Sequence, residues 1–199
     1  AKALAKSVEQ YTVDLRHEFH MHPELPLEEI WTAGRIREEL EKLNIPYAIV
    51  GDHNVIGWLD SGKGGKTIAL RADIDALPVD ELVDVPYKSQ IPGKMHACGH
   101  DAHAAMLLGT AKALAENPDF LTGKVYFVFQ CAEEIGKCAD ECVAWLVQQG
   151  DVDNALAMHL GGDFPVGTMN LLPGARFSGA EIFYIDIHGK GGHGSRPDL

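Results

Sequence analysis

The sequence has no hydrophobic run that approaches the ~18 apolar residues needed to cross a membrane as a helix. Its first 30 residues contain no apolar segment of the kind found in secretory signal peptides. Only 4 cysteines occur in 199 residues, which is too few for the dense disulfide framework of a small secreted domain. These absences predict a cytoplasmic protein without a membrane partner.

Basic residues are scarce as well. The chain has 17 Lys and Arg against 29 Asp and Glu, for a formal net charge of −12. A nucleic-acid-binding surface needs basic side chains to neutralise phosphates, so we expect no nucleic-acid partner. Carboxylates are themselves metal ligands, and the acidic balance therefore leaves a local metal site open. Hydrophobic residues make up 46% of the chain, enough for a packed core.

The stretch Met95–His103 concentrates three histidines, a cysteine and an aspartate. Cys98 and His100 are one residue apart, so a thiolate and an imidazole can turn toward the same point. Zn²⁺ and similar divalent ions accept this mixed set of sulfur and nitrogen ligands. The alternative is a surface loop that happens to be rich in histidine. The residues that follow other predicted strands favour the metal site.

Hydrophobic periodicity predicts an alternation of helices and strands. This alternation predicts an α/β fold with a mostly parallel central sheet flanked by helices. The predicted helices cover residues 3–20, 28–43, 101–116 and 138–149, and the predicted strands cover residues 47–50, 55–59, 67–72, 125–130 and 155–158.

Two further interpretations concern helix ends. Asp101 is predicted to cap the helix that follows Met95–His103. His17, His20 and His22 are interpreted as a solvated helix end, with one of them packing near a site as the alternative.

The sequence pattern changes near residues 175–180. Glu181–His188 alternates apolar and polar residues, as a strand with one buried face does, and Gly189–Gly194 is a glycine cluster. We therefore expect a first domain over residues 1–177. A second domain is expected to begin at residue 178, and this chain does not finish it.

Metal-ligand or acid–base side chains lie at the ends of several predicted strands. In open α/β sheets, ligands bind outside the carboxyl ends of the strands, so we expect these side chains to gather at one edge of the sheet. One such residue could be an accident of packing, but four such places are much harder to dismiss. The residues are Asp73 and Asp75 after strand 67–72, Cys98 and His100 before the next helix, Glu133 and Glu134 after strand 125–130, and His159 after strand 155–158.

The Glu133–Glu134 pair admits two interpretations. Adjacent carboxylates at the end of an apolar strand repel each other unless a cation or a proton intervenes. If Glu134 binds a metal ion, Glu133 is held near the water on that ion and can act as a general base. The alternative is an exposed pair at a helix start, which the helix dipole favours. With Cys98, His100 and His159 available, we favour the metal site.

Several motifs together resemble one known family. They resemble the signatures of an amidohydrolase subfamily within the dinuclear-metal aminoacylase/carboxypeptidase superfamily, which includes hippurate hydrolases and the plant hydrolases of indole-acetyl-amino acids. The resemblance runs over essentially the whole chain and implies a zinc-exopeptidase-like α/β domain followed by the start of a smaller α+β lid or dimerisation domain. The motifs are His22–Leu25, Arg71–Pro78, His96–Asp101, Phe129–Glu134 and Gly191–Ser195.

The resemblance implies a metal-dependent amidohydrolase that cleaves the amide bond of N-acyl amino acids, or of related conjugates or peptides, by means of a metal-bound water. Glu133 would be the general base, and Asp75 would orient a ligand from behind the metal centre. His193, presented by the lid, would stabilise the oxyanion. The implied ligands of two divalent ions, Mn²⁺ or Zn²⁺, are Cys98, His100, Glu134 and His159. A homodimer formed through the lid domain is also implied.

Two departures from the family pattern stand out. Relatives usually have proline where Cys131 stands and a glycine-rich turn over residues 135–138. Cys131, Cys138 and Cys142 are interpreted as small buried hydrophobic residues, with a separate zinc or redox cluster as the alternative. Relatives also continue through the lid and back into the catalytic domain, where they supply a further histidine ligand and residues that hold the substrate carboxylate. The resemblance thus implies that this chain is an incomplete part of the enzyme.

Two other function classes compete with the hydrolase. Gly189-x-Gly191-x-x-Gly194 fits a dinucleotide-binding fingerprint after a strand, but Ser195-Arg196-Pro197 follows where a helix should continue. A non-catalytic metal-binding or interaction fragment is the other alternative, favoured by the missing C-terminal portion.

Overall fold

The computed structural model describes every residue except 172, 176–178, 180–182, 197 and 199. The chain divides into two units, Ala1–Gly161 and Gly162–Leu199. All of the helices and strands named below lie in the first unit. The boundary that the sequence predicts near residue 177 falls among residues outside the described part, and it stays a prediction.

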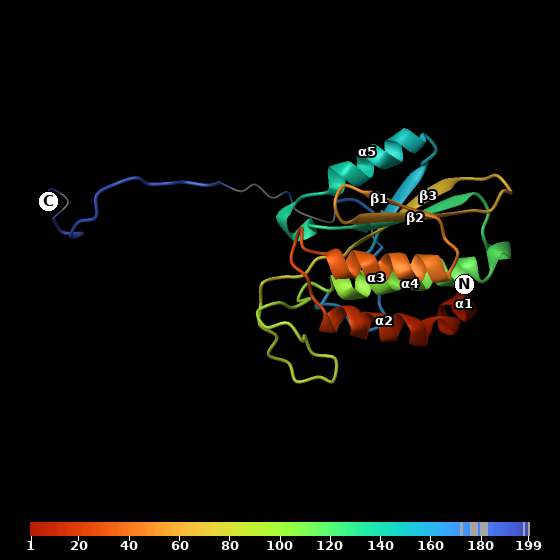
Figure 1. Cartoon of the computed structure of the whole chain (residues 1–199), viewed down its shortest axis with the longest axis horizontal. Helices are drawn as coiled ribbons and strands as arrows, with labels where there is room; N and C mark the ends of the chain where they lie inside the picture. Colours follow the sequence, from red (N-terminus) through yellow and green to blue (C-terminus); the bar gives the residue numbers. More distant parts are fainter. Residues whose placement is uncertain (172, 176–178, 180–182, 197, 199) are drawn as a thin grey trace. The chain divides into compact units, whose positions relative to one another are not determined.

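One five-stranded sheet organises the first unit, with the strand order β1-β2-β4-β3-β5 (Figure 1). The pairs β1–β2 and β2–β4 are antiparallel, whereas β3 pairs in parallel with both β4 and β5. Among these strands only β2 therefore runs against the others, which confirms the predicted α/β class. The strands are β1 (Tyr47–Val50), β2 (Asn54–Asp60), β3 (Thr67–Asp73), β4 (Lys124–Gln130) and β5 (Asn154–Ala157).

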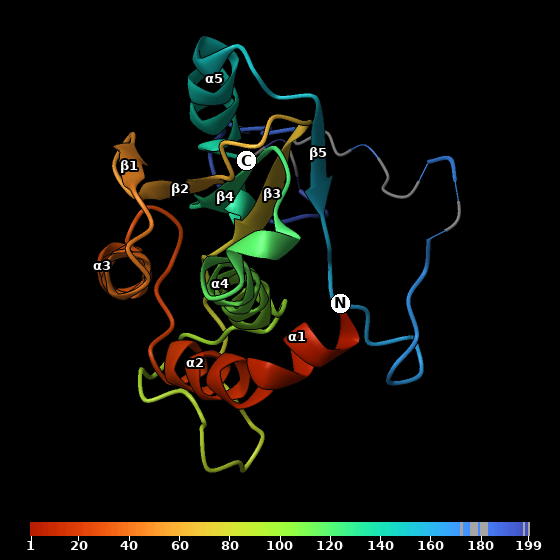
Figure 2. The same ribbon diagram turned by 90° about the vertical axis from the view of Figure 1, so that its right-hand side faces the viewer.

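Helices cover both faces of this sheet (Figure 2). Helix α5 (Ala139–Gln149) packs on one face, where Cys142 joins Ile56 and Tyr126 in a core cluster. Helices α3 (Ile30–Lys42) and α4 (His100–Ala115) pack on the other face, and α2 (Glu9–Met21) lies against α4 on the side away from the sheet. The remaining helices are α1 (Lys2–Ser7) and the short 3₁₀ helices η1 (Pro118–Phe120) and η2 (Glu133–Ile135).

The central strand β4 has the burial that its sequence predicts. Its residues from Val125 to Phe129 are each no more than 2% exposed. A strand covered on both faces does not require alternating polar residues, and this explains the continuous apolar run.

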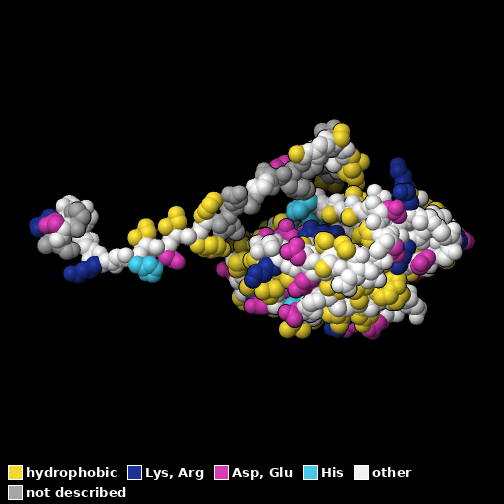
Figure 3. Space-filling view, turned by 90° about the horizontal axis from the view of Figure 1, so that it is seen from above, with side chains coloured by type: hydrophobic (Ala, Val, Ile, Leu, Met, Phe, Trp, Pro, Cys, Tyr) yellow, Lys and Arg dark blue, Asp and Glu magenta, His cyan; other side chains and the backbone are white. Residues whose placement is uncertain are grey.

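On the face of the molecule shown in Figure 3, acidic and basic side chains are interspersed with apolar ones.

The early motif His22–Leu25 serves the start of α3. The Glu24 carboxylate accepts hydrogen bonds from the backbone N–H groups of Trp31, at 3.0 Å, and Thr32, at 2.8 Å. The first N–H groups of a helix have no partner within the helix, and a carboxylate there also interacts favourably with the helix dipole. Glu24 therefore caps α3 from outside the helix.

We expect Glu24→Ala to lower the free energy of unfolding by about 1 kcal/mol, the typical effect of losing a cap. Glu24→Gln retains one acceptor oxygen and should lose less. Urea denaturation of the two variants and the wild-type protein measures both effects. Equal stability of the alanine variant and the wild type would show that water replaces the cap.

One predicted solvated histidine is buried instead. His20 is 3% exposed, and its ring nitrogens bond to Asp101, at 2.7 Å, and to Glu81, at 3.1 Å. The Asp101 carboxylate also binds Arg16 at 2.9 Å. The prediction that Asp101 caps α4 is wrong. Asp101 is the second residue of this helix, and Gly99 is the N-cap residue. His20 and Asp101 are separated by 81 positions, so helical periodicity could not have paired them.

In the described part of the second unit, the only β-bridge is an isolated one between His193 and Arg196. The strand predicted over residues 181–188 is not formed over 183–188, and residues 181 and 182 lie outside the described part. Among the described residues, no helix combines the length and apolar character needed to cross a bilayer.

Candidate metal centre

The loop before α4 brings Cys98 and His100 to a common point. Gly99 between them has φ = 107°, a conformation that glycine adopts without the strain of a side chain. His100 opens α4 and is fully buried. The Cys98 Sγ atom lies 3.4 Å from His159 Nε2. One ligand atom each from Cys98, His100 and His159 lies within 4.8 Å of the other two, so the structure brings these three predicted ligands together.

Glu133 and Glu134 follow the end of β4 and lie beside His100. His100 Nε2 lies 3.8 Å from Glu133 Oε2 and 3.8 Å from Glu134 Oε1, and these residues form a second group of possible ligands. Ala132, with φ = 54°, turns the chain at this point. Its N–H donates to the buried carboxylate of Glu29 at 2.7 Å, which holds the turn that presents both glutamates.

Asp75 connects the two groups. Its Oδ1 atom lies 3.0 Å from His100 Nδ1, and its Oδ2 atom accepts the backbone N–H of Glu134 at 2.9 Å. With Nδ1–H donating to Asp75, the lone pair of His100 Nε2 faces the centre. A histidine that ligates a metal commonly donates its other N–H to a carboxylate in this way. This geometry agrees with the orienting role predicted for Asp75, which stays a prediction.

Two buried atoms at the centre make no hydrogen bond within the described part of the chain, His100 Nε2 and Glu134 Oε1. A buried polar atom without a partner costs about 1–3 kcal/mol. Each atom belongs to a residue of the ligand groups that share His100, Cys98–His100–His159 and His100–Glu133–Glu134. Thiolate, imidazole and carboxylate donors of this kind suit Zn²⁺ and similar ions. The residues present therefore fit a divalent metal ion.

The pKa values point the same way. Burial raises the pKa of the Cys98 thiol to about 12, and the Glu134 carboxylate adds to this increase. Burial also raises the pKa of Glu134, against the opposing effect of His100. A cation would reverse both changes, because positive charge favours a thiolate and a carboxylate.

His103 has no role that the sequence predicts, but the structure places it beside the other ligand groups. Asp73, His100 and His103 form a third group of possible ligand atoms, and all three residues are buried. His103 follows His100 by three positions on α4, the spacing that places two side chains on one helix face. That spacing was the available signal, but it does not reveal what the second imidazole contacts.

The three remaining cysteines lie apart from these groups. Cys131 and Cys142 are buried, Cys138 is partly buried, and all are free thiols. Burial raises the pKa of each. None belongs to a group of possible ligands found within the described ranges. Their burial supports the interpretation as small hydrophobic residues.

His193 belongs to the second unit. Its Nδ1 atom accepts the Ser195 N–H at 3.2 Å, and the Ser195 Oγ atom lies 2.9 Å away. Its predicted catalytic role stays a prediction.

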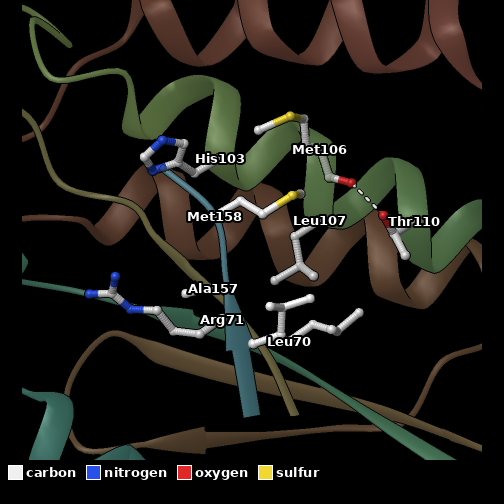
Figure 4. A pocket seen from close by; sticks show the side chains of 9 residues that line it. Leu70, Arg71, His103, Met106, Leu107, Thr110, Ala157 and Met158 are labelled. Atoms are coloured by element: carbon white, nitrogen blue, oxygen red, sulfur yellow. Dashed lines mark hydrogen bonds between the residues drawn. The ribbon is translucent and has the colours of Figure 1, made fainter. Parts of the chain in front are cut away.

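A small pocket borders the centre (Figure 4). It lies between α4 and the strands β3 and β5, with His103 and Met158 near one end and Thr110 at the other. Its volume of about 50 Å³ is below the ~300–1,000 Å³ of typical ligand pockets. By itself it is too small to hold an acylated amino acid.

Comparison with known proteins identifies several relatives. The model for peptidase family M20/M25/M40 matches residues 69–192. Thermostable carboxypeptidase 2 of Saccharolobus solfataricus is 41% identical over 196 residues, which are 96% of this chain and 50% of that protein. IAA-amino acid hydrolase ILR1-like 4 of Arabidopsis thaliana is 41% identical over 191 residues, covering 94% of this chain and 42% of that protein.

Among solved structures, a Bacillus subtilis protein described as a dinuclear metal binding peptidase from the M20 family superposes with a TM-score of 0.76 at 40% sequence identity. The match covers 81% of this chain and 45% of that chain. The present chain thus spans about half the length of the curated relatives that it matches.

Proposed function

The chain belongs to peptidase family M20/M25/M40, and from this membership we propose that the full-length protein is a metal-dependent amidohydrolase acting on N-acyl amino acids or related conjugates or peptides. The observation that carries the proposal is the meeting of Cys98, His100 and His159 within 4.8 Å, in a cluster where His100 also faces Glu133 and Glu134. The names of the carboxypeptidase and the IAA-amino acid hydrolase support an amide bond next to an amino acid as the target.

In this proposal Cys98, His100, Glu134 and His159 hold two divalent ions, Mn²⁺ or Zn²⁺. When bound, the ions polarise the amide carbonyl and make water at the centre more acidic. The Bacillus subtilis relative is described as a dinuclear metal binding peptidase, and this supports two ions per site. Asp75 fixes the ring of His100 and the backbone of Glu134.

The exposure of the two glutamates supports different roles for them. The Glu134 side chain is 18% exposed, whereas the Glu133 side chain is 42% exposed. A ligand gains from being buried against the ion, whereas a general base must reach water and substrate. Glu133 Oε2 therefore takes a proton from the attacking water and returns it to the leaving amine.

The second unit contributes the remaining parts of the proposal. Residues from 178 onward begin the lid or dimerisation domain, through which two copies associate, and His193 stabilises the developing oxyanion. A donor of this kind typically accounts for about 10²–10³ in kcat. The protein acts in the cytoplasm on small substrates.

Removal of metal from the full-length protein tests the proposal. We expect the dialysed protein to release free amino acid from N-acetyl and longer N-acyl amino acids at least about 100-fold more slowly than the metal-loaded protein, a larger loss than a single supporting residue causes. Addition of Mn²⁺ or Zn²⁺ should restore the rate. Metal uptake without release of amino acid from any substrate would identify a binding module instead of a hydrolase.

A further inference from the structure

His103 is buried inside the centre but is not one of the proposed ligands. It is 3% exposed, and its ring centroid lies 5.4 Å from that of His100 and 4.8 Å from that of His159. A buried imidazole this close to two proposed ligands either binds an ion or supports a residue that does. Its hydrogen bonds distinguish the two roles.

Both ring nitrogens of His103 have partners. Nδ1 lies 2.5 Å from Asp73 Oδ1, and Nε2 accepts the backbone N–H of Leu160 at 3.0 Å. An amide N–H can only donate, so Nε2 carries a lone pair and the ring proton is on Nδ1. The Asp73 carboxylate that receives this proton is fixed in turn by Arg71 Nη1 at 2.7 Å. Neither nitrogen of His103 is available to an ion unless it gives up one of these bonds.

Leu160 connects His103 to a proposed ligand. Its N–H donates to His103, and its carbonyl oxygen lies 2.7 Å from His159 Nδ1. A carbonyl oxygen can only accept, so His159 Nδ1 carries the proton and its Nε2 atom, 3.4 Å from the Cys98 sulfur, presents a lone pair. The backbone of Leu160 thus sets the orientation of His159.

This support is needed because the sheet ends before His159. The last paired residue of β5 is Ala157, opposite Arg71, so the ladder of backbone hydrogen bonds does not reach His159. The hydrogen bond from the Leu160 N–H to His103 holds the chain three residues beyond Ala157.

We propose that His103 is a positioning residue that acts through the Leu160 peptide group to aim the Nε2 atom of His159 at the metal centre. In this chain of hydrogen bonds, His103 donates to Asp73, the Leu160 N–H donates to His103, and His159 donates to the Leu160 carbonyl. The inference rests on the proposed function, because it takes His159 as a metal ligand.

Two amide variants in the full-length protein separate the two sides of the His103 ring. The side chain of His103→Asn can still donate to Asp73 but is too short to accept from Leu160. The side chain of His103→Gln can accept from Leu160 but loses the donor to Asp73. We expect His103→Asn to weaken metal binding by about 10–100-fold, the range found for residues that support a ligand, and His103→Gln to lie closer to the wild type. Competition with a chromogenic chelator gives both affinities.

The number of ions at saturation distinguishes positioning from ligation. A positioning role leaves the stoichiometry of each variant equal to that of the wild type, whereas loss of one ion per chain would make His103 a ligand and overturn the inference. Wild-type affinity in His103→Asn would also overturn it. If the wild type takes up no ion, the proposed function itself fails, and the positioning role of His103 fails with it. Thermal unfolding of the metal-free proteins shows whether each variant folds.

A measurement on the wild type needs no variant. Selective ¹⁵N labelling of histidine reports the tautomer of each ring by NMR, and we expect His103 and His159 both to carry the proton on Nδ1. An Nε2–H tautomer of His103 would exclude the hydrogen bond from Leu160 and overturn the inference.

Discussion

Glu133→Gln in the full-length protein is expected to lower kcat for an N-acyl amino acid by about 10²–10⁴-fold, the usual contribution of a general base. The amide has the size of the carboxylate but cannot take a proton from water. Because Glu133 is the more exposed glutamate and is not among the proposed ligands, the metal content should remain that of the wild type. Steady-state kinetics and metal analysis on one preparation measure both quantities.

Glu134→Gln is the matched control, since it makes the same chemical change at the next residue. We expect it to lose metal as well as activity. The Glu134 Oε1 atom is the buried one, lies 3.8 Å from His100 Nε2 and has no hydrogen-bond partner among the described residues. Two variants that lost both properties equally would leave no separate role for Glu133. A Glu133→Gln variant that released amino acid at the wild-type rate would exclude the proposed mechanism.

The sequence could predict this centre because of one general rule. Side chains that follow the carboxyl ends of neighbouring parallel strands meet at one edge of the sheet. Strands β3 and β4 pair in parallel, with Asp73 opposite Gln130. The residues just beyond these two strand ends are therefore neighbours in space, as the hydrogen bond from Glu134 N–H to Asp75 shows. Apolar runs predicted the strands, and the rule then predicted which side chains meet at this edge of the sheet.

The supporting contacts could not be predicted in the same way. His103 acts on a backbone N–H group 57 positions away, and a backbone donor leaves no trace in the choice of side chain at Leu160. Glu29 likewise holds a backbone N–H group 103 positions away. Polar periodicity placed His20 at a solvated helix end, because nothing in the local sequence shows that the loop with Glu81 covers it. Hydrogen bonds between distant residues decide these positions, and local patterns do not record them.

The double variant Cys98→Ala, His100→Ala is expected to lower metal affinity by at least about 100-fold, more than the loss of a supporting residue costs. It removes the Cys98 sulfur and the fully buried imidazole of His100, the residue that all three groups of possible ligands share. Cys142→Ala is the matched control, because it removes a buried thiol from α5 that lies outside those groups within the described ranges. Metal analysis after exhaustive dialysis should find ions in the control and little or none in the double variant.

The pH dependence of metal affinity gives the same prediction a second readout. Burial keeps the pKa of Cys98 at about 12 without an ion, so at neutral pH a metal ion must displace the proton from this thiol. Each unit of rising pH below that value therefore strengthens binding by up to about tenfold through Cys98 alone. The single variant Cys98→Ala should lose this part of the slope, whereas Cys142→Ala should retain it. If Cys98→Ala kept both the stoichiometry and the slope of the wild type, the sulfur would not be a ligand, and the centre would have to be rebuilt around His100 and the carboxylates.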